Sequence, residues 1–390
     1  MFRLLRNNSP PISLISAHVQ IILFMGLQCG IVGLPNVGKS TLFNAITSSN
    51  LAAAANYPFC TIEPNTGVVA VPDVRLGVLT TIAEPDKEVP ATIEFVDIAG
   101  LVKGAASGEG LGNQFLSHIR DVDAILHVVR CFDDNNIIHV DGSVNPVRDI
   151  EIIDSELIFK DIDTVDKKID GAARKAKTGD AKAKAEVDLY ERVRTHLGEG
   201  KLARTFETTN DDEILWMRDM HLITRKPVMY IANTDEAGIQ HGNDYIKLVQ
   251  EIAAKEKANV VAICAKIESE LAELPADERA AFLQELGMKE PGLNIIVRSA
   301  YDLLGLQTYF TVGKQEVRAW TVRKGAKGPE AAGVIHTDFE KGFIRAEVMK
   351  YDDFVRLKTE AAMRDAGLLR SEGRDYTVQD GDIMHFRFNV

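Results

Sequence analysis

The sequence has few cysteines, and none of them stands in a C-x-x-C pair. The four lie far apart, each within or beside an apolar run: Cys29, Cys60, Cys131 and Cys264. Disulfide frameworks and zinc sites need cysteines at short, regular spacings, and thiols stay reduced in the cytosol. We therefore expect reduced core cysteines in a cytoplasmic protein.

The chain also lacks an excess of positive charge. It has 45 lysines and arginines against 57 aspartates and glutamates, for a formal net charge of −12. Such a surface argues against indiscriminate binding of polyanions, so we expect no DNA partner, although a local basic face could still contact RNA. At 390 residues, 45% of them hydrophobic, the chain is typical of a globular protein with two or three domains.

No apolar run is long enough to span a bilayer. The most suggestive stretch, residues 12–24, follows two arginines as the core of a signal sequence would. His18 and Gln20 interrupt it, however, and no small-residue cleavage site follows. We predict that residues 1–24 are an extension that is disordered or loosely packed, and that the protein has no membrane partner.

The most informative stretch present is residues 27–44, LQCGIVGLPNVGKSTLFN. It contains the pattern G-x-x-x-x-G-K-[ST] between a strand-like run and a helix-like run, as a phosphate-binding loop requires. Gly33 and Gly38 allow backbone N–H groups to point at phosphate oxygens. Lys39 places a charge between the terminal phosphates, and Ser40 offers a hydroxyl to Mg²⁺. The pattern predicts binding of a nucleoside triphosphate.

Two further segments are typical of a nucleotide-dependent switch. Thr61, within residues 56–65, is our candidate for the threonine that completes the Mg²⁺ shell when the γ-phosphate is present. The alternative is a surface threonine in a turn. The strand-like run 93–98 carries Asp97, which fits the carboxylate that holds Mg²⁺ through water. Gly100 follows and would let a backbone N–H swing toward the γ-phosphate.

One expected residue is missing. Many switch GTPases carry a glutamine directly after the Asp-x-x-Gly sequence, where it orients the attacking water. This chain has Leu101 there, which cannot hydrogen-bond water. Another residue must position water, or hydrolysis must await a partner. We predict His139, after the strand expected over 124–130, as catalytic, with a structural role as the alternative. His118, on the helix expected over 113–120, is a weaker candidate.

The character of the chain changes between residues 149 and 219. A heptad seam of apolar residues predicts two long antiparallel helices projecting from the nucleotide-binding domain, with a break at 178–180. The seam is formed by Ile158, Ile162, Val165, Ile169, Ala172 and Ala176, and it resumes with Ala183, Val187, Tyr190 and Leu197.

Basic residues gather around the predicted tip of this hairpin: Lys167, Lys168, Arg174, Lys175, Lys177, Lys182 and Lys184. A charge run of this kind is either an ordinary solvated face or a contact with RNA, including that of a ribosome.

The strand-like runs 228–233 and 260–265 complete a mainly parallel α/β sheet, whose strand ends carry the ligand site. In P-loop GTPases the first of these ends in Asn-Lys-x-Asp, whose aspartate binds guanine. Here Asn233, Thr234 and Glu236 occupy the motif, without the lysine and with a carboxylate one methylene longer. Adenine presents the reverse pattern of donors and acceptors. We predict that these three residues contact the base and that ATP is preferred over GTP.

Taken together, the motifs identify a family. Residues 33–41, 56–65 and 95–105, with Asn233 and Glu236, closely resemble YchF, the Obg-like ATPase family of the translation-factor class of P-loop GTPases. The resemblance implies ATP or ADP as ligand, Mg²⁺, a cytoplasmic location and association with RNA and the ribosome, on its large subunit or a 70S-type particle.

The resemblance also implies site residues and an architecture. Phosphates would be contacted by Asn36, Val37, Gly38, Lys39, Ser40 and Thr41; Mg²⁺ would be bound by Ser40, Thr61 and Asp97; and adenine would lie at Thr234. Asn36 also resembles the asparagine that lets some relatives use K⁺. The implied fold is a P-loop domain (25–150 and 220–304) with an inserted helical hairpin (151–219) and a C-terminal β-grasp TGS domain (305–390).

Three functions remain open from the sequence. The first is an ATP-hydrolysing switch acting on the ribosome, in which Lys39 neutralises charge. The second is a GTP-specific GTPase of ribosome assembly, in which Asn233 and Glu236 still read guanine. The third, suggested by Leu101, is a nucleotide-gated binding protein with negligible turnover.

Overall fold

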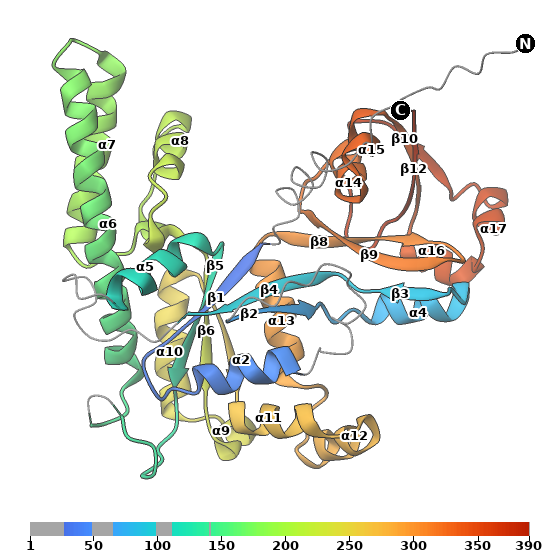
Figure 1. Cartoon of the computed structure of the whole chain (residues 1–390), viewed down its shortest axis with the longest axis horizontal. Coiled ribbons are helices and arrows are strands. Elements are labelled where there is room, and N and C mark those ends of the chain that lie inside the picture. Colours follow the sequence, from blue (N-terminus) through green and yellow to red (C-terminus); the bar gives the residue numbers. More distant parts are fainter. Residues whose placement is uncertain (1–26, 49–64, 99–110, 140–141, 390) are drawn as a thin grey trace, which may run out of the picture.

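The protein is described here by a computed structural model, which places residues 27–48, 65–98, 111–139 and 142–389. Two six-stranded sheets and a projecting helical hairpin organise these residues (Figure 1). Among them, no helix combines the length and the apolar character that a bilayer crossing needs.

The first sheet has the order β2-β4-β1-β5-β6-β7, and only the β2–β4 pair in it is antiparallel. Its central strands are continuous apolar runs because helices pack against the sheet. The strands are β1 (Gln28–Val32), β2 (Thr66–Ala70), β4 (Thr92–Asp97), β5 (Ala124–Arg130), β6 (Val228–Asn233) and β7 (Asn259–Ile263). The predicted mainly parallel α/β domain is therefore confirmed.

Eight helices of the described residues accompany this sheet, whereas α4 (Val74–Ala83) packs against the second sheet. The eight are α2 (Lys39–Ser48), α5 (Leu111–Asp121), α6 (Pro146–Ala176), α9 (Glu236–His241), α10 (Asp244–Glu256), α11 (Ala265–Glu273), α12 (Ala276–Glu285) and α13 (Gly292–Leu303).

Helices α6 and α7 (Ala181–Gly198) form the projecting hairpin. Asn145 and Asp180 cap their N-termini with side-chain oxygens. Apart from Ala176 and Ala183, the residues of the predicted seam are confirmed in a hydrophobic core that α6 and α7 share with α8 (Asp211–Asp219). Two 3₁₀ turns, η2 (Ala203–Thr205) and η3 (Ile223–Arg225), follow α7 and α8.

Helix α6 begins before the predicted start of the hairpin at residue 151. Its apolar stripe already starts at Ile150, and Ile153 and Leu157 join the core of the first sheet rather than that of the hairpin. The same continuous helix therefore serves both cores. Domain boundaries at the predicted residues stay predictions.

The second sheet has the order β11-β10-β12-β8-β9-β3. Helix α14 packs on it through Ala331 and Ala332, and the Tyr309 hydroxyl donates to the Ala331 carbonyl across 2.9 Å. This arrangement confirms the β-grasp fold predicted for the C-terminal part. Its elements are β8 (Leu306–Val312), β9 (Glu316–Arg323), α14 (Gly328–Ile335), α15 (Thr337–Lys341), β10 (Phe343–Met349), α16 (Tyr351–Leu357), α17 (Glu360–Asp365), β11 (Arg370–Glu372) and β12 (Ile383–Phe388).

One strand of this sheet comes from the N-terminal half of the chain. Strand β3 (Lys87–Val89) pairs in parallel with β9, with Lys87 opposite Glu316. Leu76 and Leu79 of α4 also share one hydrophobic core with β8 and β9. The two sheets are thus interlocked by a strand and a common core.

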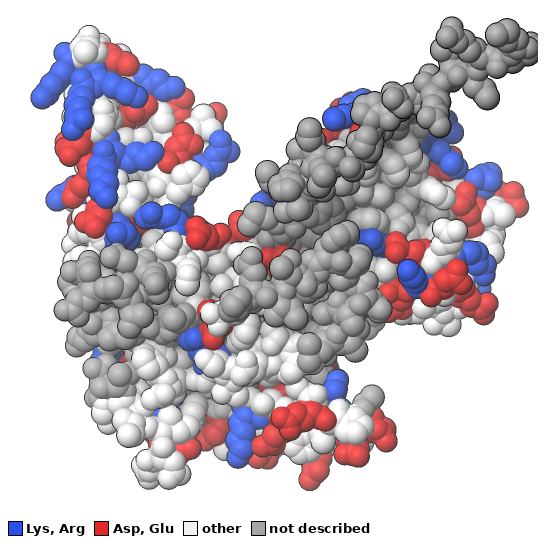
Figure 2. Space-filling view, viewed as in Figure 1, with Lys and Arg blue, Asp and Glu red and all other residues white. Residues whose placement is uncertain are grey.

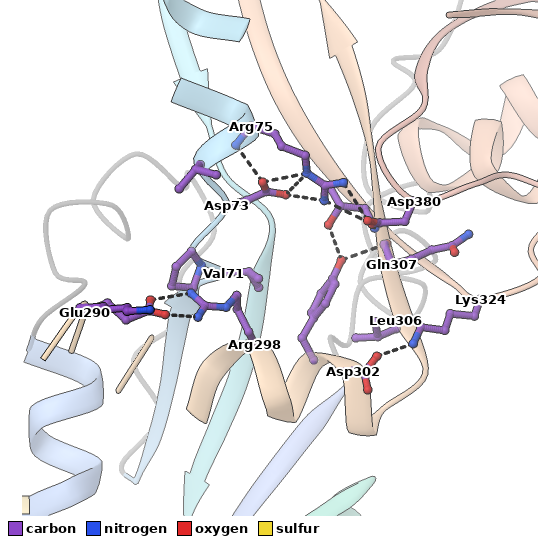
Figure 3. A pocket seen from close by; sticks show the side chains of 15 residues that line it. Val71, Asp73, Arg75, Glu290, Arg298, Asp302, Leu306, Gln307, Lys324 and Asp380 are labelled. Carbon is purple, nitrogen blue, oxygen red and sulfur yellow. Dashed lines mark hydrogen bonds and ion pairs between the residues drawn. The ribbon is translucent and has the colours of Figure 1, made fainter. Parts of the chain in front are cut away.

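A cavity of about 740 Å³ lies at this junction, and ion pairs line its walls (Figure 3). Arg75 bridges Asp73 and Asp380, with 2.7 Å between the guanidinium and each carboxylate. Arg298 pairs with Glu290 on the wall formed by α13. The charges on these walls are therefore largely satisfied by one another.

Candidate nucleotide site

The phosphate loop joins β1 to α2, as predicted, and its geometry explains its glycines. A Cβ on Gly33 would lie 2.7 Å from the Val128 carbonyl oxygen. Gly38 has φ +91°, and a Cβ there would lie 2.2 Å from the amide nitrogen of Asn233. Asn36 adopts φ +64°, a left-handed conformation that asparagine tolerates better than most residues. The loop is therefore tightly fitted against the ends of the neighbouring strands.

Three predicted site residues converge at the start of α2. Lys39, which is 9% exposed, forms an ion pair with Asp97 at the end of β4. The Ser40 hydroxyl donates to the other oxygen of Asp97 across 3.4 Å. This convergence follows from the parallel pairing of β1 with β4, which sets Ile31 opposite Asp97. A cation, a hydroxyl and a carboxylate thus meet where the loop would hold phosphates.

Asn233 anchors the phosphate loop, and its predicted contact with the base stays a prediction. Its side-chain N–H donates to the Val37 carbonyl across 2.8 Å, and its oxygen accepts from the Ala265 backbone N–H across 3.0 Å. The residue is 4% exposed. Both ends of its amide therefore tie the phosphate loop to the β7–α11 connection.

The other two base-reading candidates differ in exposure. Thr234 is buried, donates its hydroxyl to the Cys131 carbonyl and accepts from the side chain of Asn243. Its backbone N–H donates to the Ile263 carbonyl, so this N–H is already occupied within the sheet. Glu236 is exposed at the first position of α9, where its carboxylate can turn toward a ligand.

His139 is placed beside the phosphate loop but is bonded away from it. Its Nε2 lies 2.9 Å from a carboxylate oxygen of Asp149 in the first turn of α6, and both side chains are buried. The preceding residue, Ile138, accepts a hydrogen bond from Asn36 through its carbonyl. The Asp149 contact accounts for the histidine structurally, and its part in catalysis stays a prediction.

The structure leaves other predicted residues untested. Thr61, Gly100 and Leu101 fall outside the described residues. Thr41 is exposed on α2, and His118 is exposed on α5.

The cysteines in the described part of the chain are free and buried: Cys29, Cys131 and Cys264. Burial raises the pKa of the Cys131 thiol to about 12, with a further contribution from the negative charge of Asp149. Such thiols stay protonated at neutral pH, which agrees with the predicted core role. Cys60 lies outside the described residues.

Sequence reasoning missed Arg130 and Asn243. Arg130 is 2% exposed at the end of β5, and its guanidinium donates to carbonyls of the following loop. Asn243 donates to the Cys131 carbonyl across 2.8 Å. An arginine closing an apolar strand was a usable signal for the first, whereas the second has no sequence pattern.

Comparison with known proteins agrees with this geometry. Residues 28–184 match the MMR_HSR1 family model, described as a 50S ribosome-binding GTPase, and residues 306–389 match the YchF-GTPase_C model, described as a protein of unknown function. A protein of Pasteurella multocida (strain Pm70), named "Ribosome-binding ATPase YchF", is 56% identical over 366 residues, which cover 94% of this chain and 100% of the relative. The chain belongs to the YchF family.

Other members bear this out across a wide range of organisms. The "Ribosome-binding ATPase YchF" of Bacillus subtilis (strain 168) is 54% identical and is also covered over its whole length. The solved structure of the Schizosaccharomyces pombe YchF GTPase superposes with a TM-score of 0.83 at 42% identity, covering 93% of this chain and 98% of that one. YchF proteins are P-loop GTPases by fold, and the matched residues 28–184 include the converging Lys39, Ser40 and Asp97.

Proposed function

We propose that this protein is a nucleotide-dependent switch that hydrolyses ATP and associates with the ribosome. The observation that carries the proposal is the meeting of Lys39, Ser40 and Asp97 beneath a tightly fitted phosphate loop. The printed names of the relatives, ribosome-binding ATPases, support the same function. In this proposal Lys39 neutralises charge on the phosphates, Gly100 supplies a backbone N–H, and the cellular location is the cytoplasm.

The residues present fit Mg²⁺ as the metal of the site. A hydroxyl and a carboxylate offer the oxygen ligands that this ion prefers, and Asp97 already contacts Ser40. Ser40 and Asp97 would hold the ion together with Thr61, which supplies the third protein oxygen. When bound, Mg²⁺ would neutralise charge that develops on the phosphates. K⁺ near Asn36 is a further proposal that rests on the asparagine alone.

The preference for ATP rests on Thr234 and Glu236. Without the usual lysine, and with a longer exposed carboxylate, the motif lacks the fixed grip on guanine N1 and N2. GTP remains the second candidate, because the related S. pombe structure is titled a GTPase. Competitive titration of the purified chain with both nucleotides separates the two, and a clear preference for GTP would overturn the assignment.

Turnover itself needs a direct test, because Leu101 replaces the usual glutamine. Single-turnover hydrolysis with Mg²⁺ should release phosphate, and ribosomes should accelerate it. A protein that releases no phosphate under either condition would be a nucleotide-gated binding protein, not an enzyme. Replacing His139 with alanine would test its catalytic part, because a catalytic role predicts slower turnover with unchanged nucleotide affinity.

The hairpin tip is the surface that we assign to RNA. Residues 167–184 contain seven basic residues against two acidic ones, in a chain whose net charge is −12. Figure 2 shows lysine and arginine side chains gathered toward the end of the hairpin. Of the seven, all but the partly buried Lys168 are exposed. An isolated basic surface of this kind can bind phosphates although the whole protein is acidic.

Charge reversal at the tip tests this contact. Replacing Lys175 and Lys177 with glutamate should weaken binding to ribosomes and reduce the dependence of affinity on salt. The matched control reverses Lys247 and Lys289, which are exposed on the body of the protein. Equal losses from both pairs would indicate a general charge effect and would remove the tip from the proposal. The C-terminal domain, which we propose to be a TGS domain, is a second proposed contact with RNA or protein.

A further inference from the structure

The segment that follows β5 is built around one buried arginine. Arg130 donates to the carbonyls of Phe132, Asp134 and Ile137 at distances of 3.0 to 3.2 Å. Its guanidinium also lies over the Phe132 ring, 4.8 Å from the ring centroid. A buried cation is unfavourable unless its donors are hydrogen-bonded. Rearrangement of this loop would leave N–H groups of the Arg130 guanidinium buried without acceptors. Residues 131–139 are therefore held in one shape.

This segment contacts both the phosphate loop and the hairpin. Asn36 of the loop donates its side-chain N–H to the Ile138 carbonyl across 3.1 Å. His139 is bonded to Asp149 across 2.9 Å, between side chains that are 4% and 3% exposed. Asp149 also accepts from Arg148 at 3.0 Å.

Asp149 stands in the first turn of α6, whose 31 residues run without a break to the basic tip. Figure 1 shows α6 extending from the first sheet to the end of the hairpin. In a rigid helix, a displacement of the first turn also moves the far end. The phosphate loop and the first turn of α6 thus contact two consecutive residues of the segment, Ile138 and His139.

A nucleotide gives the phosphate loop a reason to change. Lys39 is paired with Asp97 in the structure, and phosphate oxygens would compete for the same ammonium group. A ligand shifts a conformation only through such a difference in contacts between two states. Exchange of the lysine's partner is that difference, and Asn36 lies in the same loop, three residues before Lys39.

We propose that residues 131–139 link the phosphate loop to helix α6, with Arg130 and Asp149 as positioning residues. The proposal rests on the proposed function, in that it requires a nucleotide to bind at the loop. Arg130 keeps the segment in shape, and Asp149 fastens it to the hairpin arm. Binding of a nucleotide at the loop thereby changes the position of the basic hairpin tip, the surface assigned to RNA.

The test compares two buried aspartates of the same helix. Asp161 is 1% exposed and accepts from the backbone N–H groups of Ile223 and Thr224, both at 2.8 Å, in the turn that follows α8. Asp149→Asn should lower kcat about tenfold while KM stays within about twofold, as expected of a positioning residue. Asp161→Asn should leave both unchanged, although it loses as much thermal stability. Equal effects on kcat would overturn the proposal.

A second readout does not depend on hydrolysis. Hydrogen exchange of the amides in residues 146–160 should change when a non-hydrolysable ATP analogue and Mg²⁺ are added, and Asp149→Asn should abolish this change. Arg130→Lys, which keeps the charge but loses the three-way donation, should weaken it. If the wild type releases no phosphate yet shows this change, the proposed hydrolysis fails and the link stands. If the wild type binds the analogue without any change in these amides, the link is overturned.

Discussion

Asn233 fastens the phosphate loop to the sheet by donating its side-chain N–H to the Val37 carbonyl across 2.8 Å. The other end of the same amide accepts from the Ala265 backbone N–H, so these two bonds fix the orientation of the side chain and use one of its two N–H groups. Among the positions after it in the motif, Glu236 is exposed.

This relationship separates two kinds of variant. Asn233→Asp replaces the donor with a second acceptor facing the Val37 carbonyl, which should weaken affinity for ATP and GTP alike by about tenfold or more. The ratio of the two affinities should stay the same, because the loop and not the base contact is damaged. Titration with both nucleotides measures this. Glu236→Gln is the counterpart, for which we expect the ratio to move while overall affinity changes little.

Removing the charge of Asp97 should affect the metal more than the nucleotide. Asp97→Asn is expected to lower turnover by about 10- to 100-fold at a fixed Mg²⁺ concentration, with partial recovery at higher Mg²⁺. Phosphate release across a Mg²⁺ series measures this. Asp123→Asn, at the opposite end of the same sheet, removes an equal charge and should leave the Mg²⁺ dependence alone. A loss of turnover in Asp97→Asn that stays the same at every Mg²⁺ concentration would contradict the role of Asp97.

The ion pair between Arg75 and Asp380 should stabilise the junction of the two sheets. Their side chains are 26% and 53% exposed, so solvent screens part of the attraction. Asp380 also accepts from the Thr308 backbone N–H, and the Arg75 guanidinium lies over the Phe310 ring. A double-mutant cycle with Arg75→Met and Asp380→Asn should give a coupling free energy of about 1 kcal/mol in chemical denaturation.

The exposed pair of Lys247 and Asp244 provides the comparison. Their side chains are 70% and 93% exposed, and the same cycle there should give a coupling near zero. A coupling at the junction no larger than this would show that the shared core and strand β3 hold the two sheets together without help from the ion pair.

Asp154 should make the protein less stable as the pH rises. Burial raises its pKa from 3.8 to about 7; Glu256 adds to this shift, and Arg204 opposes it. Between these two pH values the unfolded carboxyl is ionised while the folded one keeps its proton, so raising the pH favours unfolding until about pH 7. The free energy of unfolding of Asp154→Asn should therefore exceed that of the wild type by about 2 kcal/mol at pH 8 and by little at pH 4. The gain is smaller than the full pKa shift would give because the side chain is partly exposed to solvent.

Denaturation across that pH range measures the gain. Asp163→Asn, an exposed position on the same helix, is the control and should show no such trend. A gain for Asp154→Asn that is constant with pH would mean that the carboxyl is ionised in the folded protein at all these values.

Local patterns predicted most of the first sheet and the phosphate loop. The strand-like runs ending at Arg130 and Asn233 appear as β5 and β6 with the expected bounds, because a buried parallel strand is a continuous apolar run that sequence alone reveals. The heptad seam through Val165 likewise predicted the helical hairpin. The cluster of Lys39, Ser40 and Asp97 followed from motif and topology together.

The remaining features depend on partners that no local pattern specifies. The local sequence of Asn233 does not reveal that its amide bonds the Val37 carbonyl, because that partner lies 196 residues away in the chain. His139 and Asp149 are ten residues apart in the chain, but their contact depends on how the intervening residues fold. Strand β3 has only three residues, too few for an alternating pattern to name its sheet.

The pairing of β3 with β9 of the second sheet has a consequence for biosynthesis. A ribosome delivers residues 87–89 long before it delivers β9, so the growing chain carries this short strand unpaired until the last quarter of the protein emerges. If the C-terminal segment were made alone, β9 would be an unpaired edge strand, and its exposed backbone groups would favour edge-to-edge aggregation. Completion of the second sheet therefore requires residues from both the N-terminal and the C-terminal parts of the chain.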